Sequence, residues 1–299
     1  MAQQKRRKIE SRWPAVWFIA PSVIALLTVG LFPLGYTVYN SFHYYKLTDP
    51  AGGRPFVGLE NYAEVLTNPS FLDAVARTLG FLVIVLPIEL ALGLFIANLL
   101  HKPGVSFLRS LTRLSLVIPM ATTYAVVGLI GRLIFNREFG VVNHFLTVLG
   151  AGPVEWLGNA TNAFLALAIM DIWQWTPFCA LVLLAGFTTV PAEIEEAGRL
   201  ETRSWWKMLV HIQLPFLLPA ITAILILRTA DILKKFDEIF TMTDGGPGAA
   251  TELVSVYIQR IGFKIFDQGL ASAQAVLVFI LCIVLSRLYL ALVYRNVTQ

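Results

Sequence analysis

The residues of this sequence best able to do chemistry are polar side chains that stand almost alone inside long apolar stretches. An ionisable group surrounded by apolar chain is costly at membrane depth, so its presence there is by default a sign of function. The six candidates of this kind are Glu89, Asp171, Trp173, Gln174, Arg228 and Asp231. A carboxylate, an amide and an indole suit a hydroxyl-rich solute, because hydroxyl groups need both hydrogen-bond donors and acceptors.

A structural interpretation of the same residues stays open. A tryptophan near the end of a membrane span is often an interfacial anchor, which would explain Trp173 without any solute. Arg228 and Asp231 are three residues apart on an expected helix, so they can simply pair with each other. The residues alone do not choose between a solute path and local structure.

Long apolar helices must position these side chains. The chain has 299 residues, of which 57% are hydrophobic and 14% are charged, whereas an average soluble domain carries about 25% charged residues. Six runs are uncharged or nearly so, and each has roughly the 20 residues that cross a bilayer as a helix. We expect an all-α membrane protein with six transmembrane helices at about 14–38, 77–100, 112–135, 161–187, 212–235 and 269–294.

Basic residues set the expected orientation in the membrane. The first apolar run follows the basic stretch 5–8 and is about twice the length of a signal-peptide core, so we expect it to be retained. With the N-terminus inside, twelve basic residues lie in cytoplasmic segments and five in outer segments. Because cytoplasmic loops are the richer in Lys and Arg, we expect a multi-pass protein of the cytoplasmic (inner) membrane with both termini in the cytoplasm.

Motifs of catalysis and nucleotide binding are missing from the sequence. It contains no G-x-x-x-x-G-K-[ST] phosphate loop, no G-x-S-x-G nucleophile elbow and no H-E-x-x-H metal motif. The four histidines fall in different loops or span ends, so we expect no metal site. The net charge of +4 is too small to indicate a nucleic-acid partner. We therefore expect no catalytic residue and no bound cofactor.

One expected cytoplasmic segment, about 191–207, differs from the turn-rich outer loops. Pro191 suits a first helical position, and the glutamates that follow suit the positive end of a helix dipole, so we predict a helix. Its apolar groups, including Leu200 and the pair Trp205-Trp206, need a partner. A membrane-surface helix is the alternative, but the glutamates fit poorly beside anionic lipid, which favours docking on a protein.

This segment resembles the EAA loop of ABC importer permeases, in which E-A-A-x-x-x-G precedes I-x-L-P. The residues that correspond to it are Glu196, Ala197, Gly198, Leu200, Glu201, Ile212 and Pro215. Gly198 stands where the family has its second alanine, and Thr202 stands where it usually has glycine. The resemblance implies a coupling helix, between spans four and five, that docks in a cleft of a cytoplasmic ATPase.

Further motifs extend this resemblance over nearly the whole chain. In carbohydrate-importer permeases of the maltose and glycerol-3-phosphate type, F-x-G-L-x-N-Y follows the first span, as at 56–62 here. An F-D…T-x-G-G-P…T-E segment follows the fifth span, as at 236–252, and G-x-A-x-A opens the last span, as at 269–273. The order and the topological places match, so the chain resembles one permease subunit of a binding-protein-dependent sugar importer.

The resemblance implies partners that do what this chain lacks. They are a second permease subunit, two ATPase subunits that bind ATP and Mg, an extracytoplasmic solute-binding protein and the lipid membrane. Within this interpretation, a polyol or glycerol phosphate is an alternative solute. An ion-coupled secondary transporter would explain Glu89 and Asp171 without an ATPase, but such proteins often have a twofold internal repeat, and none is visible. A membrane scaffold subunit without a solute path is a third class.

Overall fold

The computed structural model describes residues 13–101 and 106–295. Over these residues the chain is helical, with short π-helical and 3₁₀ turns, and its only β-structure consists of two isolated bridges. The all-α fold class predicted from the apolar runs is thus confirmed. A helix satisfies its own backbone hydrogen bonds, which is the requirement for a single segment in lipid.

Five helical segments of the described chain are long and apolar enough to cross a membrane. They are α1 with α2 (Trp13–Leu26 and Phe32–Ser41, joined by a π turn at Leu27–Leu31), α4 (Pro69–His101), α8 (Ala160–Phe187), α11 (Leu214–Leu233, preceded by α10, Trp205–Lys207, and a π turn, Met208–Gln213) and α14 (Gln268–Arg295). Their apolar lengths correspond to the expected spans other than the third.

The third expected span, 112–135, is broken rather than continuous. Its two parts, α5 (Ser106–Ala121) and α6 (Tyr124–Ile134), are bent by 95° and form a sixth crossing only if they count as one span. Pro119 has no N–H to donate within the last turn of α5, and Thr123 has extended dihedral angles. The carbonyl of Thr122 accepts a 2.9 Å hydrogen bond from Gln174 Nε2, so a side chain of α8 satisfies the broken end.

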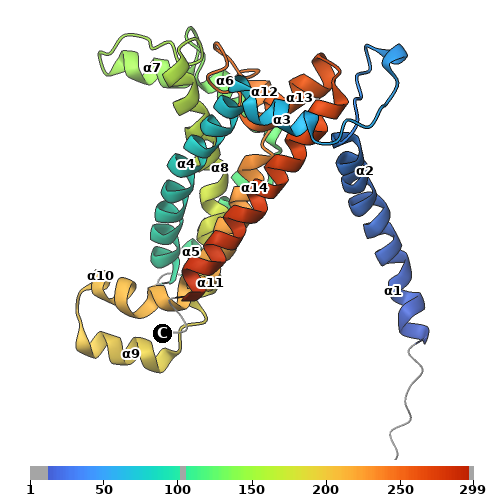
Figure 1. The fold of residues 1–299 in the computed structure, drawn as a ribbon. Helices are drawn as coiled ribbons and strands as arrows, with labels where there is room; N and C mark the ends of the chain where they lie inside the picture. The colour runs from blue at the N-terminus through green and yellow to red at the C-terminus, as the bar shows by residue number, and fades with distance from the viewer. Residues whose placement is uncertain (1–12, 102–105, 296–299) are drawn as a thin grey trace, which may run out of the picture.

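The bundle is built around α4 and α8, which lie side by side with α11 and α14 (Figure 1). A Cβ atom added to Gly93 of α4 would lie 2.6 Å from Cys179 Cβ of α8, so glycine is needed for this close approach. Phe81, Leu167 and Ile232 are fully buried in the cluster between these helices. The bundle has two ends, which we call the α9 end and the α12 end.

The α12 end carries four short helices, α3 (Glu60–Thr67), α7 (Val141–Val148), α12 (Asp237–Met242) and α13 (Val254–Gln259), in Figure 1. Two of the sequence motifs meet here. Asn61 Nδ2 donates hydrogen bonds to the carbonyls of Ser41 (2.9 Å) and His43 (3.0 Å). A Cβ atom on Gly269 would lie 2.5 Å from the His43 carbonyl. The motif residues Asn61 and Gly269 therefore join the first span to α14.

The first span otherwise stands apart from the bundle (Figure 1). Its apolar window is entirely unburied, and Phe18 and Phe32 are exposed. The contact with the rest of the chain is at the α12 end, where the Ser41 and Tyr62 hydroxyls form a 2.6 Å hydrogen bond. An apolar helix of this kind needs lipid or a second protein chain around it.

Candidate coupling segment and buried ion network

The segment that resembles the EAA loop forms a helix at the α9 end, but a shorter one than expected. Where the sequence predicts one helix over about 191–207, α9 covers Ala192–Glu201, and α10 begins only at Trp205. Thr202 has extended angles, φ −140° and ψ 134°, which a β-branched residue adopts readily. The break therefore requires no left-handed residue, and threonine in place of the family's glycine fits.

Gly198 lies where α9 packs on the π turn that precedes α11. An added Cβ atom would lie 2.5 Å from Ile212 Cδ1 and 2.8 Å from Met208 Sδ. The side chain of Ile212, one of the motif residues, thus packs directly against α9 at Gly198. Both atoms are ends of flexible side chains, so the site has no room for a large residue but can give way to a small one.

We expect Gly198→Ala to retain transport and Gly198→Leu to lose it. The alanine methyl group needs only small shifts of Ile212 and Met208, and alanine favours the helix by up to about 1 kcal/mol. The leucine side chain would force α9 off the π turn. Uptake by the reconstituted complex measures the difference. Equal uptake by both variants would contradict the role of close packing.

Glu195 ties α9 to two membrane helices. Its Oε1 atom accepts hydrogen bonds from His101 Nε2 of α4 (2.9 Å) and from Gln213 Nε2 of the π turn (2.7 Å), and Arg199 lies 3.5 Å from Oε2. Partial burial acts to raise the pKa of Glu195, but the hydrogen bonds from His101 and Gln213 and the nearby positive charges outweigh it, so the pKa is lowered. The carboxylate stays ionised and holds α9 in place.

Glu196 is among the residues predicted from the sequence motif, whereas Glu195 is not. The i,i+4 spacing of Glu195 and Arg199 was the available signal, whereas the distant partner His101 had none. Glu196, Ala197 and Leu200 lie on the opposite, exposed face, and Leu200 is 91% exposed. Glu201 is exposed at the end of α9, and Pro215 is exposed in the first turn of α11. This face combines acidic side chains with an exposed apolar leucine, a combination that suits contact with a protein partner.

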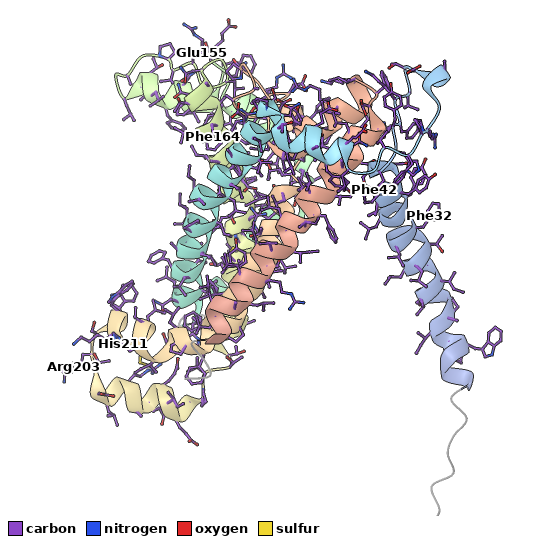
Figure 2. All side chains as sticks on the ribbon, in the orientation of Figure 1. Phe32, Phe42, Glu155, Phe164, Arg203 and His211 are labelled. Atoms are coloured by element: carbon purple, nitrogen blue, oxygen red, sulfur yellow. The ribbon has the colours of Figure 1, made fainter. Side chains whose placement is uncertain are left out.

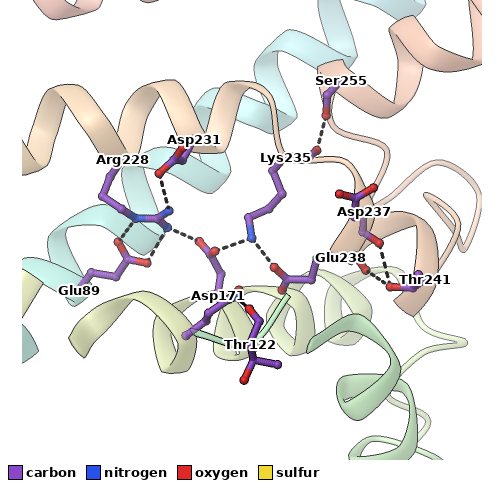
Figure 3. Close-up of polar contacts among 11 residues, drawn as sticks. Glu89, Thr122, Asp171, Arg228, Asp231, Lys235, Asp237, Glu238, Thr241 and Ser255 are labelled. Carbon is purple, nitrogen blue, oxygen red and sulfur yellow. Dashed lines mark hydrogen bonds and ion pairs between the residues drawn. The ribbon is translucent and has the colours of Figure 1, made fainter. Parts of the chain in front are cut away.

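Three of the isolated charges bind one another inside the bundle. Arg228 of α11 donates from Nε and Nη2 to both carboxylate oxygens of Glu89 in α4 (2.9 and 2.8 Å). The same Nη2 donates to Asp171 Oδ2 in α8 (2.8 Å). All three side chains are fully buried. Figure 3 shows Arg228 between the two carboxylates, so one guanidinium joins three spans.

The network continues to the α12 end through Lys235. Its Nζ atom lies 2.6 Å from Asp171 Oδ1 and also binds Glu238 of α12 (Figure 3). Lys235 and Glu238 are buried, and neither was among the sequence-based candidates. Their i,i+3 spacing resembles an ordinary surface pair. Lys235 is the last residue of the expected fifth span, and Glu238 follows it in an expected outer loop. The five residues Glu89, Asp171, Arg228, Lys235 and Glu238 are called the ion network below.

The remaining predicted residues lie elsewhere. Gln174 is buried, and its amide supports the break at Thr122. Trp173 is 44% exposed, and its side chain makes no hydrogen bond with any residue that the structure describes. Asp231 is partly exposed and pairs with Lys234 at 2.9 Å, while its distance to Arg228 Nη1 is 4.0 Å. Trp173 and Asp231 thus reach the surface of this chain, whereas Glu89, Asp171 and Arg228 are fully buried.

Comparison with known proteins gives the class of this chain. Residues 89–299 match the model of the binding-protein-dependent transport system inner membrane component family. The chain belongs to this family, which confirms the resemblance drawn from the sequence motifs. It is a membrane-spanning permease subunit of an ABC transporter.

Individual relatives and structures agree with this assignment. The trehalose/maltose transport system permease protein MalF of Thermococcus litoralis is 34% identical over 91% of this chain and 90% of its own. The sulfoquinovosyl glycerol permease protein SmoG of Agrobacterium fabrum is 35% identical over 93% and 90%. A chain of a bacterial alginate ABC transporter has the same fold, with a TM-score of 0.81, 19% identity and coverage of 95% and 96%.

Proposed function

We propose that this chain forms half of the translocation path of an ATP-driven importer for a sugar or a related polyhydroxy solute. The named solutes of its relatives, trehalose/maltose and sulfoquinovosyl glycerol, support this solute class. A second permease subunit supplies the other half, and the unburied first span offers it an apolar surface. An extracytoplasmic binding protein delivers the solute at the α12 end. The α9 end and both termini face the cytoplasm.

The observation that carries the coupling role is the position of α9. One face rests on the π turn and is tied to α4 and α11 through Glu195, and the other presents Glu196 and Leu200 to a partner. Two ATPase subunits bind ATP and Mg, and one of them holds α9 in its cleft. When they close, α9 moves, and its bonds pull α4 and α11 with it. This chain makes and breaks no covalent bond.

The ion network determines which helices move together when α9 moves. Because Arg228 joins α4, α8 and α11 in the bundle interior, these helices move as one body. The pore opens and closes between this body and the partner permease. The buried charges therefore keep the path wall rigid, and the accessible residues Trp173 and Asp231 remain our candidates for solute contact.

Uptake into proteoliposomes tests the proposal. The complete complex, with binding protein outside and ATP inside, is expected to accumulate a labelled sugar from a panel of sugars, polyols and glycerol phosphate, and vanadate is expected to stop uptake. Accumulation driven by an ion gradient without ATP would refute the importer. Preference for glycerol phosphate over every sugar would support the alternative solute instead.

A change at Trp173 tests the solute path. We expect Trp173→Ala to lower uptake by about tenfold without loss of the complex, because the indole is half-exposed and supports little of the bundle core. Uptake and complex yield are measured together, with Trp17→Ala in the separate first span as the matched control. Unchanged uptake would remove Trp173 from the path and leave it as an interfacial anchor.

A further inference from the structure

A cavity of about 310 Å³ lies at the α9 end, between the end of α4 and the break that separates α9 from α10. Its polar lining includes His101, Arg199, Thr202, Arg203 and Ser204. No described residue of the lining is acidic. The cavity is thus lined by positively charged side chains and hydrogen-bond donors, and it lies beside the non-helical residues between α9 and α10.

The arginines of this cavity lack a full counter-charge within the chain. Arg203 makes no ion pair with any described residue, and it projects from the loop that joins α9 to α10 (Figure 2). Arg199 reaches Glu195 only at 3.5 Å, and that carboxylate already accepts hydrogen bonds from His101 and Gln213. A guanidinium presents a planar set of donors that matches a phosphate group.

Two hydroxyl groups add donors to the same wall. Thr202 Oγ1 accepts a hydrogen bond from the Ser204 amide (3.2 Å), and Ser204 Oγ accepts one from the Lys207 amide (3.5 Å). Because each oxygen is used as an acceptor, its own proton is free to be donated into the cavity. Guanidinium and hydroxyl donors without an acid define a site for a phosphate-type anion.

The position of the cavity indicates where that anion comes from. Trp205 lines the cavity and packs edge-on against Trp206, with ring centroids 5.5 Å apart, and the two are 53% and 58% exposed. This pair begins the apolar segment Trp205–Leu233. Exposed tryptophans at the start of a span lie at headgroup level, and basic pockets on the cytoplasmic side bind anionic headgroups.

We propose that this cavity binds the phosphate headgroup of an anionic lipid. Arg203, with the hydroxyls of Thr202 and Ser204, holds the phosphate, and Trp205 and Trp206 lie against the glycerol and the upper acyl chain. The bound headgroup fills the angle between α9 and α10, so it sets the position from which α9 meets its partner. The site would make the transporter respond to the lipid composition of its own leaflet.

Lipid titration of the purified, delipidated complex tests this site. Binding of radiolabelled phosphatidylglycerol is measured for wild type, for Arg203→Gln and for Lys207→Gln, the matched control. Lys207 carries the same charge four residues further on but does not line the cavity. We expect Arg203→Gln to weaken binding by about tenfold, because a charge-assisted hydrogen-bonded contact is lost, and Lys207→Gln to change it less than about twofold.

Two comparisons separate the outcomes. Equal losses for both variants would show attraction to general surface charge and overturn the site, as would no loss for either. Inorganic phosphate is added as a competitor at constant ionic strength, so that the screening of general surface charge does not change during the titration. Complete displacement of the lipid by phosphate alone would overturn the lipid as the occupant. Because binding is measured without ATP or solute, the result is independent of whether the complex imports sugar.

Discussion

Arg228→Met is expected to prevent the transporter complex from assembling in the membrane, so that almost no complex is recovered. The substitution leaves Glu89 and Asp171 buried with one of their cations gone, and breaking a buried pair costs about 3–5 kcal/mol. That is a large fraction of the total stability of a typical domain, about 5–15 kcal/mol. Complex yield in membranes and its thermal unfolding temperature are the measurements. The matched control is Lys234→Met, which removes an exposed cation (71% side-chain exposure) from the same helix end.

A compensating variant separates charge from shape. In Glu89→Gln/Arg228→Met the removed cation is matched by the removal of one carboxylate, and Asp171 keeps Lys235 at 2.6 Å. We expect this double variant to recover a substantial part of the lost yield, because an unpaired buried charge costs more than a neutral pair. If Arg228→Met alone assembled and transported normally, the ion network would not be what holds α4, α8 and α11 together.

The ion network also illustrates what the sequence could predict. A single charge in an apolar run is conspicuous, so Glu89, Asp171 and Arg228 were found by position alone. Their pairing was not predictable, because it depends on which faces of three helices meet, and apolar runs without a marked hydrophobic face carry no such information. Lys235 was not predicted because it ends the expected fifth span, next to the exposed Lys234, where a charged residue is ordinary.

The break in the third expected span was likewise not predictable from the sequence. Apolar length predicted helices in the right places because about 20 residues are needed to cross a bilayer. It did not predict the 95° bend at 122–123, because Pro119 is one of several prolines in the apolar runs and Pro87 and Pro177 lie within continuous helices. What distinguishes this break is the amide of Gln174 on the Thr122 carbonyl, a contact from another helix.

Glu196→Lys is expected to uncouple the transporter while the chain itself still folds. Glu196 is exposed on the outer face of α9, and its side chain makes no hydrogen bond or ion pair with a described residue, whereas Glu195 beside it makes several. Charge reversal at a protein interface costs several kcal/mol when like charges meet. We expect uptake and binding-protein-stimulated ATP hydrolysis to fall by at least about tenfold, with the permease pair present at normal yield.

Glu138→Lys is the control for the effect of the net-charge change on the yield of the permease pair, because Glu138 is exposed and lies away from the proposed ATPase cleft. Glu195→Ala tests the other side of α9: it removes the acceptor shared by His101 and Gln213, so the ATPase is expected to bind while its closure no longer moves α4. The Glu196 variant thus tests the docking of α9 on the ATPase, and the Glu195 variant tests whether movement of α9 reaches α4 and α11. Normal uptake and normal ATPase stimulation in Glu196→Lys would show that α9 docks by a different face or does not dock at all.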